Sequence, residues 1–481
     1  GIANAALSQL SYIPMPTQES CPFGPFPRFV RLFPARDGTS LNRKATAEPL
    51  SSGSLPEEIL LRSLLSRKSA TSLTLIYATA RVNPNIGITF QPLEPDYAPS
   101  TAGSEAMTST KKDPIIVVVQ LTGGSDYMNM VVPYADPLYY DNRPTVGIPV
   151  DDVLQIDDRF GFNPALGAVK NLYDQGEVAI VNGVGYPNPN RSHFRAMDIW
   201  HTCEPEKIAT EGWLGRVIRD IDPHGENVLT GVNFGRGLPR ALALTGVPVA
   251  SVAVLEGYGV LTGIQGQEQR ARALDVFERM YSPAIGSGAA MDYLGRTGLD
   301  ALKGADILKT ATDSYSSTIE YAATPISRSL RGMAQVILKD LGTRVLYTSQ
   351  GGYDTHANQV PVQTPLLSEL SAGIGDFFAD LEEHDAADNV MMLVFTEFGR
   401  RVKDNGSGSD HGSGGGCYII GQPVNGGMHG EYPSLKEDDQ LDGDLHFNVD
   451  YRSVYSTIVE KWMGLDGKSV VGGNYEPLNF I

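Results

Sequence analysis

The chain contains very little cysteine. Only Cys21, Cys203 and Cys417 occur in 481 residues, and they are far apart and odd in number. This excludes a disulfide framework and a CxxC metal site. No apolar run reaches the roughly 18 residues that a membrane helix needs, so no membrane span is expected. Basic residues are also scarce, 38 against 56 acidic ones, and the net charge of −18 argues against nucleic acid or an anionic membrane as the main partner.

Several common catalytic motifs are absent as well. There is no GxSxG elbow, which argues against an α/β-hydrolase esterase. No P-loop and no GxGxxG segment follows a strand pattern, so nucleotide-binding sites of those types are not expected. Residues 1–20 show no basic segment followed by an apolar run, and no twin-arginine leader is visible. A cytoplasmic location is therefore the expectation from this sequence.

The composition divides the chain into two parts. Residues 1–112 are rich in Pro, Ser, Thr and Arg and carry only short apolar patches, which predicts a poorly ordered N-terminal extension. Within this extension, 56–70 could form a short helix and 72–82 a strand. From residue 113 onward the apolar pattern is much stronger, so 113–481 is predicted to be the folded domain.

The pattern of the second part predicts an α/β fold. Continuous β-branched or apolar runs at 114–121, 177–185, 344–352 and 389–399 are typical of strands covered on both faces. Apolar residues recur at helical spacing in 164–176 and 360–384. This alternation predicts a three-layer α/β/α architecture around a mostly parallel sheet.

Polar clusters follow these predicted strands. Asp126 lies in "GGSD", Ser192 in "NRSHF", Asp354 and His356 in "GGYDTHANQ", and Glu397 in "TEFGR". A fifth cluster, in "GSGSDHGSGGG", contributes residues 410 and 411 ahead of another apolar run. Because ligands bind beyond the carboxyl ends of parallel strands, the five clusters are expected to converge on one edge of the sheet.

These residue types predict a metal site beside a nucleophile. Carboxylates and imidazoles together are ligands for zinc or manganese, whereas carboxylates alone favour calcium or magnesium. A divalent ion beside a serine would lower the pKa of its hydroxyl and neutralise an anionic ester. The predicted metal ligands are Asp126, Asp354, His356, Glu397, Asp410 and His411, and the predicted catalytic residues are Ser192, His193, Arg191 and Arg400, with the arginines clamping the ester oxygens.

Each of these residues also has an ordinary structural explanation. Ser192 precedes a helical pattern, where serine is a preferred N-cap, and Asp126 follows two glycines, where aspartate often bonds its own backbone in a turn. His193 could simply bond a neighbouring loop, Glu397 could pair with Arg400, and Asp410 could cap a loop. A Gly-Gly-x-Asp-x-His segment after a buried strand is a more specific combination.

Four long segments resemble one family. "VVVQLTGGSDYMNMVVPY", "VGYPNPNRSHFRAMDIW", "QGGYDTHANQ" and "FTEFGRRVKDNGSGSDHG" are together similar to the DUF1501 family, which is grouped with the alkaline phosphatase-like superfamily. The resemblance extends over roughly residues 113–481. It implies an alkaline phosphatase-like fold, a serine nucleophile at Ser192, and metal ligands at Asp126, Asp354, His356 and His411. Many relatives are exported, in contrast to the location expected above.

The sequence departs from the superfamily pattern at one pair of positions. Where the superfamily has Asp-His, this chain has Glu397-Phe398, and the spacing from Asp354 to His356 is shorter than usual. One metal, an altered metal or none are therefore all open. The leading hypothesis is a metal-dependent hydrolase of phosphate or sulfate esters, with zinc, manganese or calcium as the cofactor and a small anionic ester as the partner. The alternatives are a non-catalytic member that binds an anion or a partner, and a phosphosugar mutase or isomerase.

Overall fold

The computed structural model describes residues 78–83, 87–92, 112–255, 267–281, 288–313 and 315–481. The chain divides into two units, 1–109 and 110–481. In the first unit, the described residues form an antiparallel pair, β1 (Ala78–Asn83) and β2 (Gly87–Pro92). Strand β1 covers the end of the strand predicted at 72–82, and the helix predicted at 56–70 lies outside the described residues.

The second unit is built on a nine-stranded sheet. Its strands are hydrogen-bonded in the order β13-β7-β12-β11-β3-β10-β8-β9, and β14 also pairs with β7. Only β12 runs antiparallel to its neighbours β11 and β7, so the sheet is mostly parallel. The strands are β3 (Ile115–Thr122), β7 (Val178–Gly185), β8 (Gly231–Phe234), β9 (Ala250–Val252), β10 (Val345–Gly351), β11 (Val390–Thr396), β12 (Gly415–Ile420), β13 (Gly427–His429) and β14 (Val449–Asp450).

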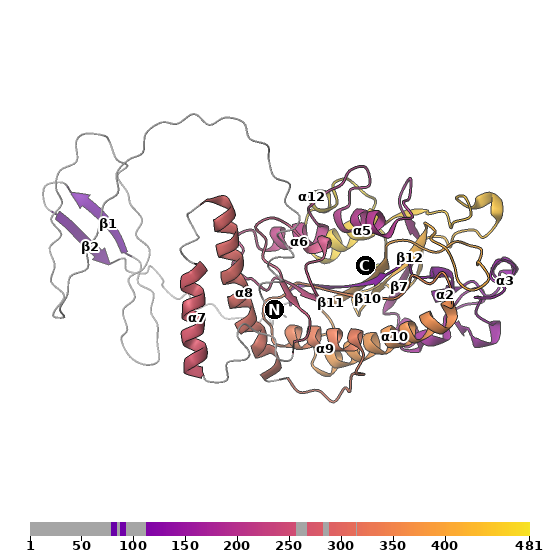
Figure 1. Ribbon diagram of the computed structural model, residues 1–481, viewed down its shortest axis with the longest axis horizontal. Helices are drawn as coiled ribbons and strands as arrows, with labels where there is room; N and C mark the ends of the chain where they lie inside the picture. Colours follow the sequence, from indigo (N-terminus) through magenta and orange to yellow (C-terminus); the bar gives the residue numbers. More distant parts are fainter. Residues whose placement is uncertain (1–77, 84–86, 93–111, 256–266, 282–287, 314) are drawn as a thin grey trace, which may run out of the picture. The chain divides into compact units, whose positions relative to one another are not determined.

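Helices cover both faces of this sheet (Figure 1). On one face lie α4 (Gly167–Asp174), α9 (Pro325–Leu338) and α10 (Gln359–Glu383), and on the other α5 (His193–Thr202), α6 (Trp213–Ile221), α11 (Tyr451–Thr457) and α12 (Gly467–Val471). The predicted three-layer α/β/α fold with a mostly parallel sheet is therefore confirmed. Strand β3 shows why Ile115–Val119 is an unbroken apolar run: Val117 and Val119 face one apolar core, whereas Ile116 and Val118 face the other.

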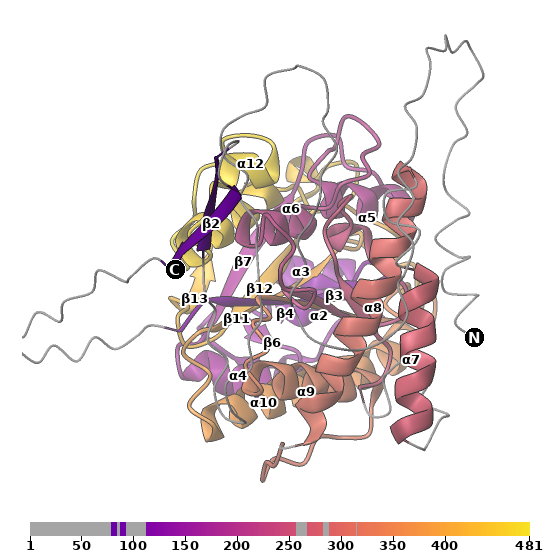
Figure 2. The same cartoon turned by 90° about the vertical axis from the view of Figure 1, so that its left-hand side faces the viewer.

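Smaller elements complete the unit. A short three-stranded sheet consists of β4 (Val131–Val132), β6 (Gly161–Phe162) and β5 (Leu154–Gln155). The other α-helices of the described residues are α2 (Tyr127–Met130), α3 (Pro137–Asn142), α7 (Gln267–Tyr281) and α8 (Ala289–Asp313), and the last two run lengthwise beside each other at the right of Figure 2. The short 3₁₀ turns are η1 (Val150–Asp152), η2 (Pro164–Leu166), η3 (Arg240–Leu242) and η5 (Glu437–Asp439), and η6 (Ile458–Trp462) is a π-helical turn. Over the described residues, every helix is too short or too polar to cross a bilayer.

The predicted elements agree closely with the observed ones. The strands expected at 114–121, 177–185, 344–352 and 389–399 are β3, β7, β10 and β11. The helix expected at 164–176 begins as η2 and continues as α4, and the one expected at 360–384 is α10. The four strands contribute side chains to both apolar cores, as expected for strands covered on both faces, and the two helices contribute theirs to one core.

A buried histidine fixes α5 to the sheet. The Nε2 atom of His201 lies 2.8 Å from the Oε1 atom of Gln120 on β3, and the hydroxyl of Tyr347 on β10 contacts both groups. Burial lowers the pKa of His201 to about 4, because the charged imidazolium would lose its hydration. His201 is thus neutral in the folded protein at pH values where it is already protonated in the unfolded chain.

This histidine predicts a specific loss of stability in acid. The pKa of about 4 in the folded state lies below the ordinary value of 6.5, so the unfolded state binds more protons and stability falls as the pH drops from 6.5 to 4. The full contribution is on the order of 3 kcal/mol. Urea unfolding at pH 7, 5.5 and 4.5 should show a shallower pH dependence in His201→Gln than in the native protein. His224→Ala, which removes an exposed histidine, should keep the native dependence of unfolding free energy on pH. Equal pH dependence in all three proteins would contradict the role given to His201.

Candidate functional site

Strand direction brings the five polar clusters to one edge of the sheet. Asp126, Ser192, Asp354 and Glu397 each follow the carboxyl end of a parallel strand, namely β3, β7, β10 and β11. His411 instead precedes β12. Because β12 is antiparallel to its neighbours, its start lies at the same edge as the ends of the others.

His411 is presented on a hairpin that links β11 to β12. The backbone amide of Gly399 donates to the carbonyl of Ser413 at 3.0 Å, and that of Gly412 donates to the carbonyl of Gly399 at 2.9 Å. Arg400 and His411 are paired directly across this hairpin. A side chain at Gly399 would place its Cβ atom 2.0 Å from the carbonyl oxygen of Gly414, so this close approach requires glycine.

Three imidazoles converge on one carboxylate oxygen. The Nε2 atoms of His193, His356 and His411 lie 3.3, 3.1 and 3.0 Å from Oδ1 of Asp354. The Nε2 atoms of His356 and His411 are only 3.0 Å from each other. Among the described residues, His193, Asp354 and His411 form a group whose ligand atoms all lie within 4.8 Å of one another. We call His193, His356, His411 and Asp354 together the histidine cluster.

His193 is oriented by a buried carboxylate behind it. Its Nδ1 atom lies 2.8 Å from Oε1 of Glu397, a residue that is fully buried. The same Oε1 atom accepts a hydrogen bond from the backbone amide of Gly123 at 2.9 Å, and Oε2 contacts the hydroxyl of Thr396 at 3.1 Å. Glu397 therefore acts as an acceptor for Nδ1–H and directs Nε2 of His193 towards Asp354, as carboxylates behind metal-binding histidines do.

The other two histidines are held in the same way. Nδ1 of His411 lies 2.7 Å from the carbonyl oxygen of Arg191, and Nδ1 of His356 lies 2.9 Å from Oδ1 of Asp410. Each of these oxygens can only accept, so Nδ1 carries the proton and Nε2 presents its lone pair to the cluster. The predicted ligands His356, Asp410 and His411 thus occur together, with Asp410 bonded to an imidazole.

The charges around Asp354 favour its ionised form. Partial burial alone would raise the pKa of Asp354, but the hydrogen bond from the Arg400 guanidinium and the contact with His411 outweigh it and hold that pKa well below its usual range. The hydrogen bond to Glu397 raises the pKa of His193 against the opposing effect of burial. The cluster therefore combines an ionised carboxylate with the imidazole of His193, which the neighbouring carboxylates make more basic.

The guanidinium of Arg400 is bonded within the protein and does not face an open site, as the predicted ester clamp would. Its side chain is fully buried, and all three guanidinium nitrogens donate to groups of the protein. Nη2 lies 2.9 Å from Oδ1 of Asp354. The remaining acceptors are the backbone carbonyls of Gly123, Gly124, Tyr353 and Ser409. Arg400 thus fixes Asp354 and the surrounding loops, and its donors are not directed at solvent.

Arg191 is also bonded to carboxylates. Its Nε atom lies 2.8 Å from Oδ2 of the fully buried Asp444, and Nη2 lies 3.4 Å from Oδ2 of Asp442. An ester clamp would require these ion pairs to open. The backbone of Arg191 is nevertheless close to the cluster, because its carbonyl accepts from His411.

Ser192 lies between two residues that contact the cluster. It is exposed and occupies the N-cap position of α5, but its side chain makes no capping hydrogen bond. Its backbone amide donates to Oδ1 of Asn190 at 2.9 Å. The hydroxyl is therefore available beside the free backbone N–H groups that begin a helix.

Asp126 lies in a separate buried ion pair. It is fully buried, and its Oδ2 atom accepts from Nη1 of Arg143 and from Nε2 of Gln359. Arg143 also donates to the backbone carbonyls of Arg401 and Val402. The expectation that Asp126 is a metal ligand differs from this placement, because the arginine already neutralises its charge. No local pattern in the sequence indicates Arg143, 17 positions away, as the partner of Asp126.

Phe398 packs directly against the cluster. Its ring centroid lies 4.8 Å from that of His193 and 5.0 Å from that of His411. Phe398 is buried, and it also packs against the Gly124 turn, where an added Cβ atom would lie 2.4 Å from the ring. An apolar wall therefore occupies one side of the cluster.

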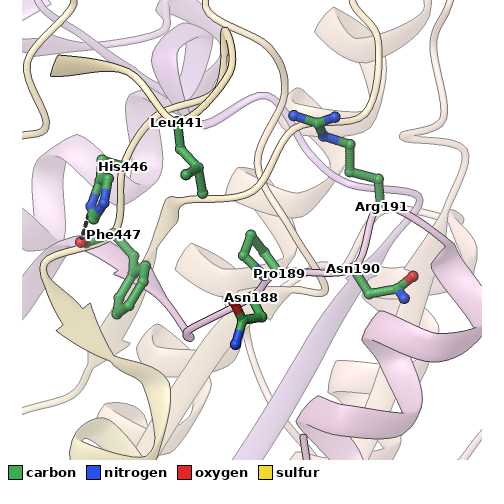
Figure 3. Close-up of a pocket in the computed structure, with 7 residues that line it drawn as sticks. All are labelled: Asn188, Pro189, Asn190, Arg191, Leu441, His446 and Phe447. Atoms are coloured by element: carbon green, nitrogen blue, oxygen red, sulfur yellow. Dashed lines mark hydrogen bonds between the residues drawn. The ribbon is translucent and has the colours of Figure 1, made fainter. Parts of the chain in front are cut away.

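A polar pocket adjoins Ser192 (Figure 3). It has a volume of about 610 Å³ and lies between residues 188–191 and residues 441–447. Its lining includes Asn188, Arg191 and Phe447. Residues 188–191 lead directly into Ser192 and His193, so the segment that lines the pocket is continuous in the chain with a residue of the histidine cluster.

Comparison with known proteins gives a partial family match. Residues 287–474 match the model of a family described as "Protein of unknown function (DUF1501)". This range includes Asp354, Glu397 and His411 but not Asp126 or Ser192, so it is shorter than the resemblance predicted over 113–481. No curated protein matches the chain.

Solved structures with similar folds share little sequence. A protein in the alkaline phosphatase superfamily from Vibrio parahaemolyticus has a TM-score of 0.33 and 10% identity, covering 75% of this chain and 69% of its own. PsFucS1 sulfatase from Pseudoalteromonas sp. has a TM-score of 0.35 and 12% identity, covering 76% and 70%. Phosphonate monoester hydrolase of Agrobacterium radiobacter has a TM-score of 0.35 and 9% identity, covering 76% and 78%. Likeness at this level does not determine the chemistry of the site.

The ion pair of Asp126 predicts a large effect on stability. Asp126→Asn should lower the free energy of unfolding by about 3–5 kcal/mol, because it leaves the buried charge of Arg143 uncompensated. Asp174→Asn, which removes an exposed partner of Lys170, should change it by no more than about 0.5 kcal/mol. Urea unfolding of both variants measures the difference. A small effect of Asp126→Asn would contradict a structural role and return the residue to the candidate ligands.

Proposed function

We propose that the histidine cluster binds one divalent cation through His193, Asp354 and His411. The observation that carries this proposal is the convergence of imidazole Nε2 atoms on a carboxylate oxygen, each with its Nδ1–H directed elsewhere. Lone pairs facing a negative oxygen repel one another unless a proton or a cation lies between them. The Nε2 atom of His193 is buried and has no hydrogen-bond partner, although it lies 3.3 Å from Asp354.

The chemistry of the donors indicates which cation fits. Two imidazole nitrogens and one carboxylate oxygen suit zinc or manganese better than calcium or magnesium, which prefer oxygen ligands alone. The oxygens behind the imidazoles, from Glu397 and from the Arg191 carbonyl, fix each ring as they do in metal sites. Phe398 closes one side of the cluster, which supports one cation instead of two.

The reaction that this site supports best is hydrolysis of a phosphate or sulfate ester, with Ser192 as the nucleophile. When bound, the cation would neutralise ester oxygens and lower the pKa of a nearby hydroxyl. The Ser192 hydroxyl would attack phosphorus or sulfur as the bond to the leaving alcohol breaks, and the first backbone N–H groups of α5 would face the anionic ester. Water would then release the product and restore the serine.

His356 is suited to transfer protons in this scheme. Its side chain is about half exposed, and Asp410 holds its Nδ1 atom. Its Nε2 atom lies 3.0 Å from that of His411, at the border of the proposed ligand set. A histidine positioned by a carboxylate can take the proton of the attacking hydroxyl, give it to the leaving alcohol, and then take a proton from the water that releases the product and return it to the serine.

One observation favours a second candidate, a binding protein without turnover. Arg191 and Arg400, the residues predicted to clamp ester oxygens, are both bonded to carboxylates of the protein. Without a clamp, the site would bind an anion through the cation and the start of α5 alone. Ester turnover distinguishes the two candidates, because both predict a bound cation.

The metal site predicts a defined stoichiometry. Elemental analysis of the purified protein after zinc or manganese reconstitution should find about one ion per chain, and His411→Ala should lose it. Glu397→Gln should retain the ion but bind it about 10–100-fold more weakly, because the ring of His193 loses a charged acceptor. His224→Ala, an exposed histidine outside the cluster, should keep native stoichiometry. No ion in the reconstituted native protein would overturn the proposal.

The nucleophile predicts a separate loss of activity. Ser192→Ala should lower kcat on p-nitrophenyl phosphate or p-nitrophenyl sulfate by at least about 10³-fold while retaining the metal. Ser368→Ala, an exposed serine on α10, should leave kcat unchanged. If neither ester is turned over by the metal-loaded native protein, the binding candidate is favoured. Full activity in Ser192→Ala would show that another group is the nucleophile.

A further inference from the structure

The pocket beside Ser192 has a chemical character different from that of the histidine cluster. Its lining combines apolar groups (Pro189, Leu441 and Phe447) with polar ones (Asn188 and His446), as Figure 3 shows. Its volume of about 610 Å³ falls within the range of roughly 300–1,000 Å³ that is typical of small-molecule sites. This space could hold one or two six-membered rings bearing hydroxyl groups.

The pocket offers no uncompensated positive charge to an anion. Arg191 is its one arginine, and this side chain is paired with the buried Asp444 at 2.7 Å and with the exposed Asp442 at 3.4 Å. Arg401 also lies 3.9 Å from Asp442 and 3.7 Å from Asp444, so two guanidiniums and two carboxylates leave this edge without net charge. The edge therefore offers no net attraction to a second anionic group, and a neutral group loses nothing by binding here.

The aromatic rings and the side-chain amide of this pocket suit the apolar C–H faces and the polar hydroxyl groups of a sugar. The rings of His446 and Phe447 are nearly parallel, with centroids 5.5 Å apart and an interplanar angle of 12°. Flat rings of this kind pack against the C–H face of a pyranose. The amide of Asn188 both donates and accepts, which suits hydroxyl groups that do the same. Nδ1 of His446 lies 2.7 Å from the Phe447 carbonyl, so its Nε2 atom remains an acceptor.

The walls of the pocket are held in place before any ligand arrives. The carbonyl of Leu445 accepts from the backbone amide of Gly414 and from the hydroxyl of Ser413, both at 3.0 Å. Phe447 packs against Gly185 at the end of β7, where an added Cβ atom would lie 2.7 Å from that of Phe447. On the other wall, Asn188 adopts a left-handed conformation with φ of 53°, a geometry that costs energy and is often found at binding sites.

The pocket is also coupled to the candidate nucleophile. Asn190, which contributes to its lining, accepts a hydrogen bond from the backbone amide of Ser192 at 2.9 Å. The next residue, Arg191, accepts from His411 through its carbonyl. A group bound in the pocket would therefore contact Asn190 and Arg191, which are hydrogen-bonded to Ser192 and to His411 of the histidine cluster.

We infer that this pocket binds a neutral glycosyl group and is the subsite for the alcohol part of the ester. The inference rests on the proposed function for the placement of the ester, but binding of the sugar itself requires neither the cation nor Ser192. The substrate class is a sugar that carries its phosphate or sulfate at one position and neutral hydroxyl groups elsewhere.

Calorimetry with neutral sugars tests the inference directly. The probes are methyl glucoside, methyl galactoside, maltose and lactose, titrated into the full chain and into Ser192→Ala after metal removal. At least one probe should bind saturably to both proteins. Asn188→Gly, which keeps the left-handed backbone but removes the amide, and His446→Ala should each weaken binding about 10-fold. The matched controls are Asp385→Gly, another exposed residue with φ of 53°, and His224→Ala.

Kinetics separates this inference from the proposed function. Asn188→Gly should raise KM for glucose 6-phosphate or glucose 6-sulfate while leaving KM for methyl phosphate or methyl sulfate unchanged. If the pocket variants weaken sugar binding but no ester is turned over, the sugar site is supported and the proposed hydrolase activity is overturned. Ester turnover without saturable sugar binding, or sugar binding unaffected by both variants, would overturn the sugar site alone.

Discussion

The buried guanidinium of Arg400 is the interaction on which the geometry of the site depends. It bonds the turn after β3, the loop after β10 and the hairpin before β12, and it originates from the loop after β11. Its bond to Asp354 fixes the oxygen on which the histidines converge. A planar group with five donors can satisfy carbonyls from several directions, which lysine cannot do. The loops after β3, β10 and β11 and the hairpin before β12 are thereby held in one arrangement by a single side chain.

The sequence predicted the sheet well because each strand carries its own evidence. A run such as 114–121 is buried on both faces, so its apolar residues are continuous and recognisable without knowledge of their neighbours. Asp354, His356 and His411 could be proposed for a similar reason, since their residue types and positions after or before strands indicate a site. The direction of β12, which places His411 at the correct edge, was not apparent from its short apolar run.

The roles of individual charged residues were less predictable. Asp126 and Arg400 have the residue types of a ligand and an ester clamp, yet each is fully buried and bonded within the protein. Their partners come from distant parts of the chain: Gln359, at the start of α10, lies 233 positions from Asp126, and Gly123 lies 277 positions from Arg400. Which atoms a side chain meets is decided by how loops from different strands pack together. Sequence spacing contains no information on that packing.

The wide separation of the cluster residues along the chain has a consequence for folding. His193 and Glu397 are 204 positions apart, and they meet only after β7 and β11 have joined the same sheet through β12. Contacts between such distant positions form late, because closing long loops costs entropy before any bond compensates for it. A bound ion would therefore leave the folding rate largely unchanged and slow unfolding instead. Its benefit would be a longer lifetime of the native state once the chain is folded.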